Sequence, residues 1–134
     1  FLENGYTKEE MKMVNETRKI LSKPDLKITA TCVRVPVRYS HSISINVELE
    51  NDFNLDDVRK IIKDSKGLIL EDDVKNNIYP MPINAEGRDE VFVGRIRRDE
   101  SIDKGLNLWV VADNIRKGAA TNTVQIMELF INNK

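Results

Sequence analysis

Two hydrophobic periods divide the chain into expected helices and strands. Apolar positions recur three or four residues apart after Thr7, which forms a T-x-x-E capping box with Glu10, and this helix ends before Pro24. The same helical period covers Leu55–Lys63 and, with a glycine-alanine start, Gly118–Asn132. Three helices are therefore predicted, the first of them with a well-defined N-terminus.

Alternation of apolar with other residues predicts strands. It covers Lys27–Val37, Ser42–Glu48, Val91–Arg97 and Leu106–Ala112, and a short apolar run at Leu68–Leu70 adds another strand. These elements predict an α+β fold, a mostly antiparallel sheet with helices packed on one face.

Three details of this sheet can be tested. In the strand that begins at Val91, strict alternation separates Val91, Val93, Arg95 and Arg97 from Phe92, Gly94 and Ile96. Leu106–Ala112 is apolar on both faces, so we expect both of its faces to be covered. The long polar stretch Asp72–Asp89 is predicted to be a loop that takes part in function or in a protein interface, with Tyr79 and Met81 as its anchors.

Composition excludes several classes of protein. A chain of 134 residues that is 40% hydrophobic and 32% charged is typical of one globular domain. The net charge is −1 and no basic stripe is present, so nucleic acid is not an expected partner. No apolar run approaches the roughly 20 residues of a membrane helix, and no membrane partner is expected.

A single cysteine, Cys32, argues against an internal disulfide or a cysteine-rich zinc site. No metal site is expected, and the cytoplasm is the expected compartment. Because the first residue is Phe1 rather than Met, we also expect the chain to be a fragment of a longer protein.

Arg34 and His41 are the first candidates for chemistry. Arg34 interrupts an apolar run, where a guanidinium is costly to bury unless an anion pairs with it. His41 is the only histidine and can change charge near neutral pH. Arg34 as an anion clamp and His41 as a proton carrier is one reading. The ordinary reading is a strand arginine that faces solvent or an acid, and a surface histidine.

Cys32 as a nucleophile is disfavoured, because free cysteines in apolar strands are mostly buried and inert.

The first helix contains two Glu-Lys pairs, Glu9 with Lys12 and Glu16 with Lys19, and the members of each pair are three residues, or one turn, apart. By themselves both are surface ion pairs worth a few tenths of a kcal/mol.

Four segments, in order along the chain, resemble aspartate-semialdehyde dehydrogenases. They are E-E-M-K…E-T-R-K-I-L at 9–21, C-V-R-V-P-V-x-x-x-H-S at 32–42, Y-P-M-P-I-N-A-E-G-R-D-E-V-F-V-G-R-I-R at 79–97 and L-W-V-V-A-D-N-I-R-K-G-A-A at 108–120. N-x-V-Q-I at 122–126 extends the last one. Each segment alone is weak evidence, but together they are specific.

The resemblance implies an enzyme that reduces L-aspartyl-4-phosphate to L-aspartate-4-semialdehyde with NADPH. It implies that His41, seven positions after Arg34, is the acid/base and that Arg34 holds the substrate α-carboxylate. It also implies that Glu9 meets the substrate amino group, Lys12 meets phosphate and Asn114 touches the nicotinamide cofactor. It favours Glu9 and Lys12 over the second Glu-Lys pair.

The family's cysteine segment of the S-N-P-N-C type, its glycine-rich dinucleotide fingerprint and the arginine that partners Lys12 are absent from the sequence. We therefore expect 1–134 to be an incomplete C-terminal catalytic and dimerisation domain, like that of glyceraldehyde-3-phosphate dehydrogenase, without the Rossmann domain. It is expected to be inactive alone and to form a homodimer. The alternative is a non-catalytic α+β dimerisation or small-anion-binding module.

Overall fold

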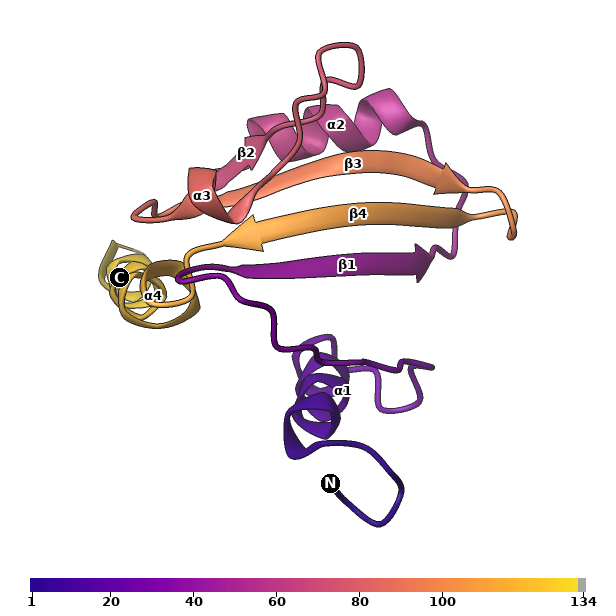
Figure 1. The fold of residues 1–134 in the computed structure, drawn as a ribbon. Helices are drawn as coiled ribbons and strands as arrows, with labels where there is room; N and C mark the ends of the chain where they lie inside the picture. The colour runs from indigo at the N-terminus through magenta and orange to yellow at the C-terminus, as the bar shows by residue number, and fades with distance from the viewer. Residues whose placement is uncertain (133–134) are drawn as a thin grey trace. The chain divides into compact units, whose positions relative to one another are not determined.

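The computed structural model describes residues 1–132 and divides into two compact units, Phe1–Pro36 and Val37–Lys134. The first unit contains the helix α1 (Lys8–Ile20), and the second contains a four-stranded sheet with the remaining helices (Figure 1). Each unit is described by itself.

The first unit is one capped helix followed by an extended segment. α1 begins after Thr7, whose capping box with Glu10 is present as predicted. The predicted strand Lys27–Val37 is wrong, because residues 27–36 pair with no other strand in the part of the chain that the structure describes. Alternation in this segment indicates extended backbone, but a strand also needs a neighbour to complete its hydrogen bonds.

The second unit is built on a mixed sheet in the order β1-β4-β3-β2. Its strands are β1 (His41–Glu48), β2 (Leu68–Leu70), β3 (Val91–Asp99) and β4 (Gly105–Ala112). Only β2 and β3 run parallel, and the other pairs are antiparallel. The α+β fold with a mostly antiparallel sheet is therefore confirmed, and the start of β1 lies beside the end of β4 (Figure 1).

The sheet has an apolar cluster on each face. On one face α2 (Leu55–Asp64) contributes Ile62, which packs with Val93, Ile96 and Leu106. On the other, Ala85 of the one-turn helix α3 (Pro82–Ala85) packs with Phe92 and Val111 of the sheet. β4 is thus covered on both faces, as predicted. α3 lies opposite α2, so not all the helices share one face, and four residues are too few to show a helical period.

A β-bulge in β3 changes which residues face the core. Gly94 pairs with Trp109 and Arg97 pairs with Asn107, so two β3 residues oppose one residue of β4. Arg95 takes up the bulge with φ 54°. Ile96 therefore joins Val93 in the same cluster. The predicted alternation, which placed Ile96 and Val93 on opposite faces, is wrong beyond Gly94.

Two side chains complete the hydrogen bonds that the bulge leaves open. The Ile96 N–H donates to Asp72 Oδ1 at 3.2 Å, and the Ile96 carbonyl accepts from Arg59 Nη2 at 3.1 Å. Arg59 Nε also pairs with Asp72 Oδ2 at 2.9 Å. This ion pair fastens α2 to β3 and satisfies the irregular backbone.

The loop 72–89 is anchored by a proline. Pro80 is fully buried, its carbonyl accepts from Trp109 Nε1 at 3.0 Å, and its ring packs over Gly94. A Cβ at Gly94 would lie 2.0 Å from the Glu71 carbonyl oxygen, so this close approach requires glycine. The predicted anchors Tyr79 and Met81 are instead about 40% exposed, so that prediction is wrong.

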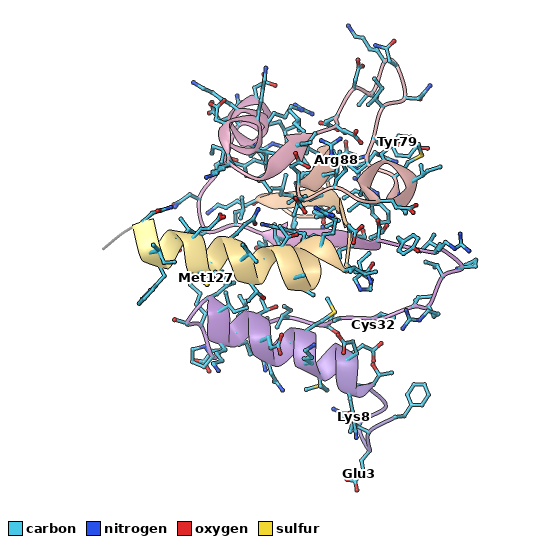
Figure 2. The ribbon with its side chains drawn as sticks, turned by 90° about the vertical axis from the view of Figure 1, so that its left-hand side faces the viewer. Glu3, Lys8, Cys32, Tyr79, Arg88 and Met127 are labelled. Carbon is cyan, nitrogen blue, oxygen red and sulfur yellow. The ribbon has the colours of Figure 1, made fainter. Side chains whose placement is uncertain are left out.

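The last helical segment is in two parts. A π-helical turn, η1 (Arg116–Ala120), precedes α4 (Thr121–Asn132), where the sequence predicted one helix from Gly118. In η1 the amides of Gly118 and Ala120 donate to carbonyls five residues back, those of Asp113 and Ile115. The helix therefore begins earlier than predicted. α4 has no buried residue, and Met127 on it is exposed (Figure 2).

Candidate functional site

Glu9 and Lys12 lie together on the exposed side of α1. Lys12 Nζ is 3.6 Å from Glu9 Oε1, and the side chains are 56% and 64% exposed. Water screens such a pair, so it contributes little to stability. Both charges remain accessible to a ligand.

Glu10, next to this pair, is a structural residue. Its buried carboxylate accepts from the Thr7 N–H at 2.7 Å and from the Cys32 N–H at 2.8 Å. These two backbone hydrogen bonds, that of Thr7 first, lower the pKa of Glu10. Glu10 thus caps α1 and also fastens the extended segment that carries Arg34. The sequence showed the cap but not the second contact.

The Cys32 thiol is exposed rather than buried, which corrects the expectation from the sequence. Its sulfur is 3.5 Å from Met13 Sδ (Cys32 is labelled in Figure 2). Partial burial, and then the negative charges of Glu10 and Glu9, raise the pKa of this thiol. A raised pKa favours the thiol over the nucleophilic thiolate, which argues against Cys32 as a nucleophile.

Arg34 is exposed and has no ion pair or hydrogen bond within residues 1–132. The neighbouring Val33 and Val35 are 75% and 51% exposed, so the apolar run around Arg34 is not a buried strand. Arg34 therefore faces solvent, as the ordinary interpretation of the sequence expected, although the segment that carries it is not a strand. An exposed, unpaired guanidinium can still form two hydrogen bonds to an incoming carboxylate.

His41 is the first residue of β1 and pairs in register with Ala112 at the end of β4. The residue before it, Ser40, is buried and has φ 75°. The Ser40 N–H donates to Asn114 Oδ1 at 2.9 Å, and the Ser40 hydroxyl donates to the Pro82 carbonyl at 3.2 Å. Asn114 thus forms a direct hydrogen bond to Ser40, the residue that precedes His41.

Asp113 fixes the segment that carries Asn114. Its buried carboxylate accepts from the backbone amides of Gly87, Ile115 and Arg116 at 2.8, 2.8 and 3.0 Å. The bonds from Gly87 and then Arg116 lower the pKa of Asp113, so it is a carboxylate at neutral pH. The turn after β4 is therefore tied to the loop before β3.

Asp89 fixes the next turn. Arg116 contacts it through both ends of its guanidinium fork, at 2.6 and 3.0 Å, and the Thr121 hydroxyl donates to it at 2.8 Å. The Arg116 hydrogen bonds, followed by that of Thr121, lower the pKa of Asp89 to about 2. This contact holds η1 and the start of α4 against the β3 end of the loop.

The structure groups the predicted site residues by unit. Glu9, Lys12 and Arg34 lie in the first unit, and His41 and Asn114 lie in the second. Ser40 was missed by sequence reasoning. The only signal was a polar residue directly before the histidine, and its partner is 74 positions away.

Among residues 1–132 no group of three or more His, Cys, Asp or Glu side chains is arranged to hold a metal ion. In the same part of the chain, no helix is both long and apolar enough to cross a membrane.

Residues 1–117 match the family described as "Semialdehyde dehydrogenase, dimerisation domain", and the chain belongs to this family. Its relatives carry a more specific name. The chain is 59% identical over 131 residues to a protein of Aquifex aeolicus named aspartate-semialdehyde dehydrogenase. The aligned residues make up 98% of this chain and 38% of that protein.

Two further relatives agree. A Bacillus subtilis protein of the same name is 50% identical, over 96% of this chain and 37% of its own length. A solved structure described as aspartate semialdehyde dehydrogenase II from Vibrio cholerae, complexed with ASA, matches with a TM-score of 0.91 and 47% identity, over 98% of this chain and 39% of that one. The chain thus spans less than two-fifths of the relatives it matches.

Proposed function

We propose that this chain is the C-terminal catalytic and dimerisation domain of an aspartate-semialdehyde dehydrogenase. The complete enzyme reduces L-aspartyl-4-phosphate to L-aspartate-4-semialdehyde with NADPH and releases phosphate, a step of lysine, threonine and methionine synthesis. The proposal is carried by the 59% identity to a protein of that name along nearly all of this chain. The compartment expected for such an enzyme is the cytoplasm.

The charges of the first unit complement those of this substrate. L-aspartyl-4-phosphate carries an ammonium, a carboxylate and a phosphate. In the proposal Glu9 receives the ammonium, Arg34 the carboxylate and Lys12 the phosphate. Support comes from the exposure of all three side chains and from the lack of any other partner for Arg34 within residues 1–132. A planar guanidinium also fits a carboxylate better than an ammonium group would.

His41 is the proposed acid/base. The nucleophilic thiolate is proposed to come from outside these residues, because the S-N-P-N-C-type segment that the family resemblance implies for it does not occur in the sequence. The imidazole of His41 would take a proton from that thiol and return it to the departing group. Its exposure at the start of a strand, on backbone fixed by hydrogen bonds, suits a group that must meet a substrate.

A nicotinamide cofactor, NADP in the proposal, supplies the hydride when bound. Asn114 fits one end of it. Its Oδ1 is occupied by the Ser40 N–H, which leaves the Nδ2 amide as a donor toward a carboxamide oxygen. The glycine-rich turn that would hold the dinucleotide phosphates does not occur in the sequence.

An activity assay tests this proposal. NADP-dependent oxidation of aspartate semialdehyde in phosphate buffer would be measured for the 134-residue chain and for the longest natural protein that contains it. We expect turnover by the longer protein only. Absence of turnover in the longer protein would contradict the assigned reaction, and turnover well above blank by the short chain would contradict its proposed dependence on missing segments.

The proposed homodimer rests on the family description and on exposed apolar side chains of the loop 72–89. Val74 and Ile78 are 77% and 49% exposed, and Ile83 of α3, which lies within residues 72–89, is 75% exposed. Such exposed apolar residues favour an interface. Light scattering at micromolar concentration should give a dimer mass, and Ile83→Glu should lower that mass. The matched control is Ile61→Glu on α2, where Ile61 is 66% exposed. A monomer mass for the unchanged chain would contradict the dimer.

The second candidate is a non-catalytic module that binds a small anion. The exposed, unpaired Arg34 favours it. The two candidates differ in a simple experiment, because inorganic phosphate binding to a longer protein without dehydrogenase turnover would favour the module. Turnover would exclude it.

A further inference from the structure

We propose that Ser40 and Asn114 are positioning residues for His41, and that together they fix the backbone from which the imidazole projects. Their hydrogen bond is here called the Ser40–Asn114 clip. The catalytic meaning of the clip rests on the proposed function, since it assumes that His41 is the acid/base. The clip itself is a structural claim and can be tested without any activity.

The conformation of Ser40 shows that something must hold it. Its φ of 75° lies in the left-handed region, which is unfavourable for residues other than glycine. Ser40 is also buried, with 5% of its surface exposed. A buried serine in this conformation persists only if its surroundings fix it, and both its N–H and its hydroxyl have partners.

These partners come from two separate elements. Asn114 follows β4 and receives the Ser40 N–H, and Pro82 at the start of α3 receives the hydroxyl. Asn114 is anchored by its neighbour Asp113, which accepts hydrogen bonds from three backbone amides. Pro82 is anchored because α3, which it begins, contains the completely buried Ala85. The clip therefore ties Ser40 to fixed points.

The clip acts one residue from the imidazole. His41 is the first ladder residue of β1, in register with Ala112, and the strand does not extend to Ser40. Without the clip, the ladder between β1 and β4 would hold the chain from His41 onward, but the residues before His41 would lack this tie. The start of β1 would then fray, as strand and chain ends do when nothing ties them. The clip thus limits the orientations open to an exposed ring.

The clip also separates two possible roles of Asn114. Because the Ser40 N–H is a donor, the Asn114 atom that it contacts is the carbonyl oxygen, and the amide nitrogen remains a donor. Asn114→Asp keeps an oxygen for Ser40 and removes the amide donor. Asn114→Ala removes both. The pair of variants therefore distinguishes positioning of His41 from contact with a cofactor.

The structural arm uses the 134-residue chain, in which His41 is the only histidine and gives a single set of ring signals in an NMR spectrum. We expect Asn114→Ala to shift or broaden these signals and Asn114→Asp to restore them toward the original positions. Asn76→Ala is the matched control, since Asn76 donates only within the exposed turn at Asp73. Ring signals that Asn114→Ala leaves unchanged would overturn the clip.

The kinetic arm uses the longer natural protein. We expect Asn114→Ala, which loses both the clip and the amide donor, to lower kcat at least tenfold and to raise the KM for NADP. Asn114→Asp, which keeps an oxygen for Ser40, should recover most of that kcat while the KM for NADP stays raised. An equal loss of kcat in both variants would overturn positioning and leave Asn114 as a cofactor contact only. If the unchanged protein shows no turnover, the proposed function fails, and the NMR arm still decides the clip.

Discussion

The two units differ in how they are held together. The second has a four-stranded sheet with an apolar cluster on each face. The first buries only Glu10 and Val14, and its extended segment is tied to α1 by hydrogen bonds such as Glu10 to Cys32 and Tyr6 to Thr29. Sheet and core therefore support His41, whereas polar contacts support Glu9, Lys12 and Arg34.

This difference suggests a division of labour. A proton carrier needs a fixed position, since proton transfer depends on short, aligned contacts. Charged side chains that capture a substrate can tolerate more motion, because charge attraction acts over a longer range. We therefore propose proton transfer for the cored unit and substrate capture for the lightly held one.

The largest expected effect lies in the second unit. Asp72→Ala removes the partner of Arg59 and of the Ile96 N–H. We expect a loss of about 3 kcal/mol in unfolding free energy, the lower end of the range for a broken buried pair, because Arg59 is 29% exposed. Urea unfolding followed by fluorescence of Trp109, the only tryptophan, measures this.

Asp56→Ala is the matched control for Asp72→Ala. Asp56 also contacts Arg59, at 3.3 Å, but it is 91% exposed. We expect it to cost under about 0.5 kcal/mol. Equal losses from the two variants would contradict a structural role for the buried ion pair at the bulge.

A smaller effect is expected in the first unit. Thr7→Ala removes the hydroxyl that caps α1 and should cost this helix about 1 kcal/mol. Hydrogen exchange of the α1 amides should become faster, while Trp109 unfolding should stay unchanged. Thr17→Ala, inside the same helix, should slow that exchange slightly, because alanine is the better helix former. A change in Trp109 unfolding would show that the units are not independent.

The smallest effect is a pH dependence. The pKa of Asp89 is lowered to about 2, chiefly by Arg116, so its contribution to stability is present above the ordinary carboxyl pKa. It is lost as the pH falls from about 4 to 2. Asp89→Asn should make the Trp109 transition less pH-dependent in this window. Asp64→Asn, at an exposed position on α2, should leave the pH dependence of that transition unchanged. An equal loss of pH dependence in both variants would count against the Arg116 contact.

Elements with a clear period could be predicted from the sequence. β1, α2, β2 and β4 lie within a residue of their predicted ends, since alternation and capping are local signals. Residues 27–37 were mistaken for a strand because extended backbone and strand pairing give the same alternation. The second error, at Ile96, arose because a bulge shifts the period by one residue without any change in composition.

The candidate site also has one part that the sequence showed and another that only the structure showed. The residue types at Glu9, Lys12, Arg34 and His41 are visible in the sequence, and family resemblance assigned their roles. The partner of Ser40 was not visible, because a single hydrogen bond across 74 positions leaves no periodic pattern. Contacts that position a reactive group require the fold.

Steady-state kinetics of two variants of the longer protein test the division of labour most directly. His41→Ala should lower kcat about 10²–10⁴-fold with little change in KM. Arg34→Lys should mainly raise the KM for aspartate semialdehyde, since it keeps the charge and loses the fork. The opposite pattern, a kcat effect from Arg34→Lys and only a KM effect from His41→Ala, would contradict the account.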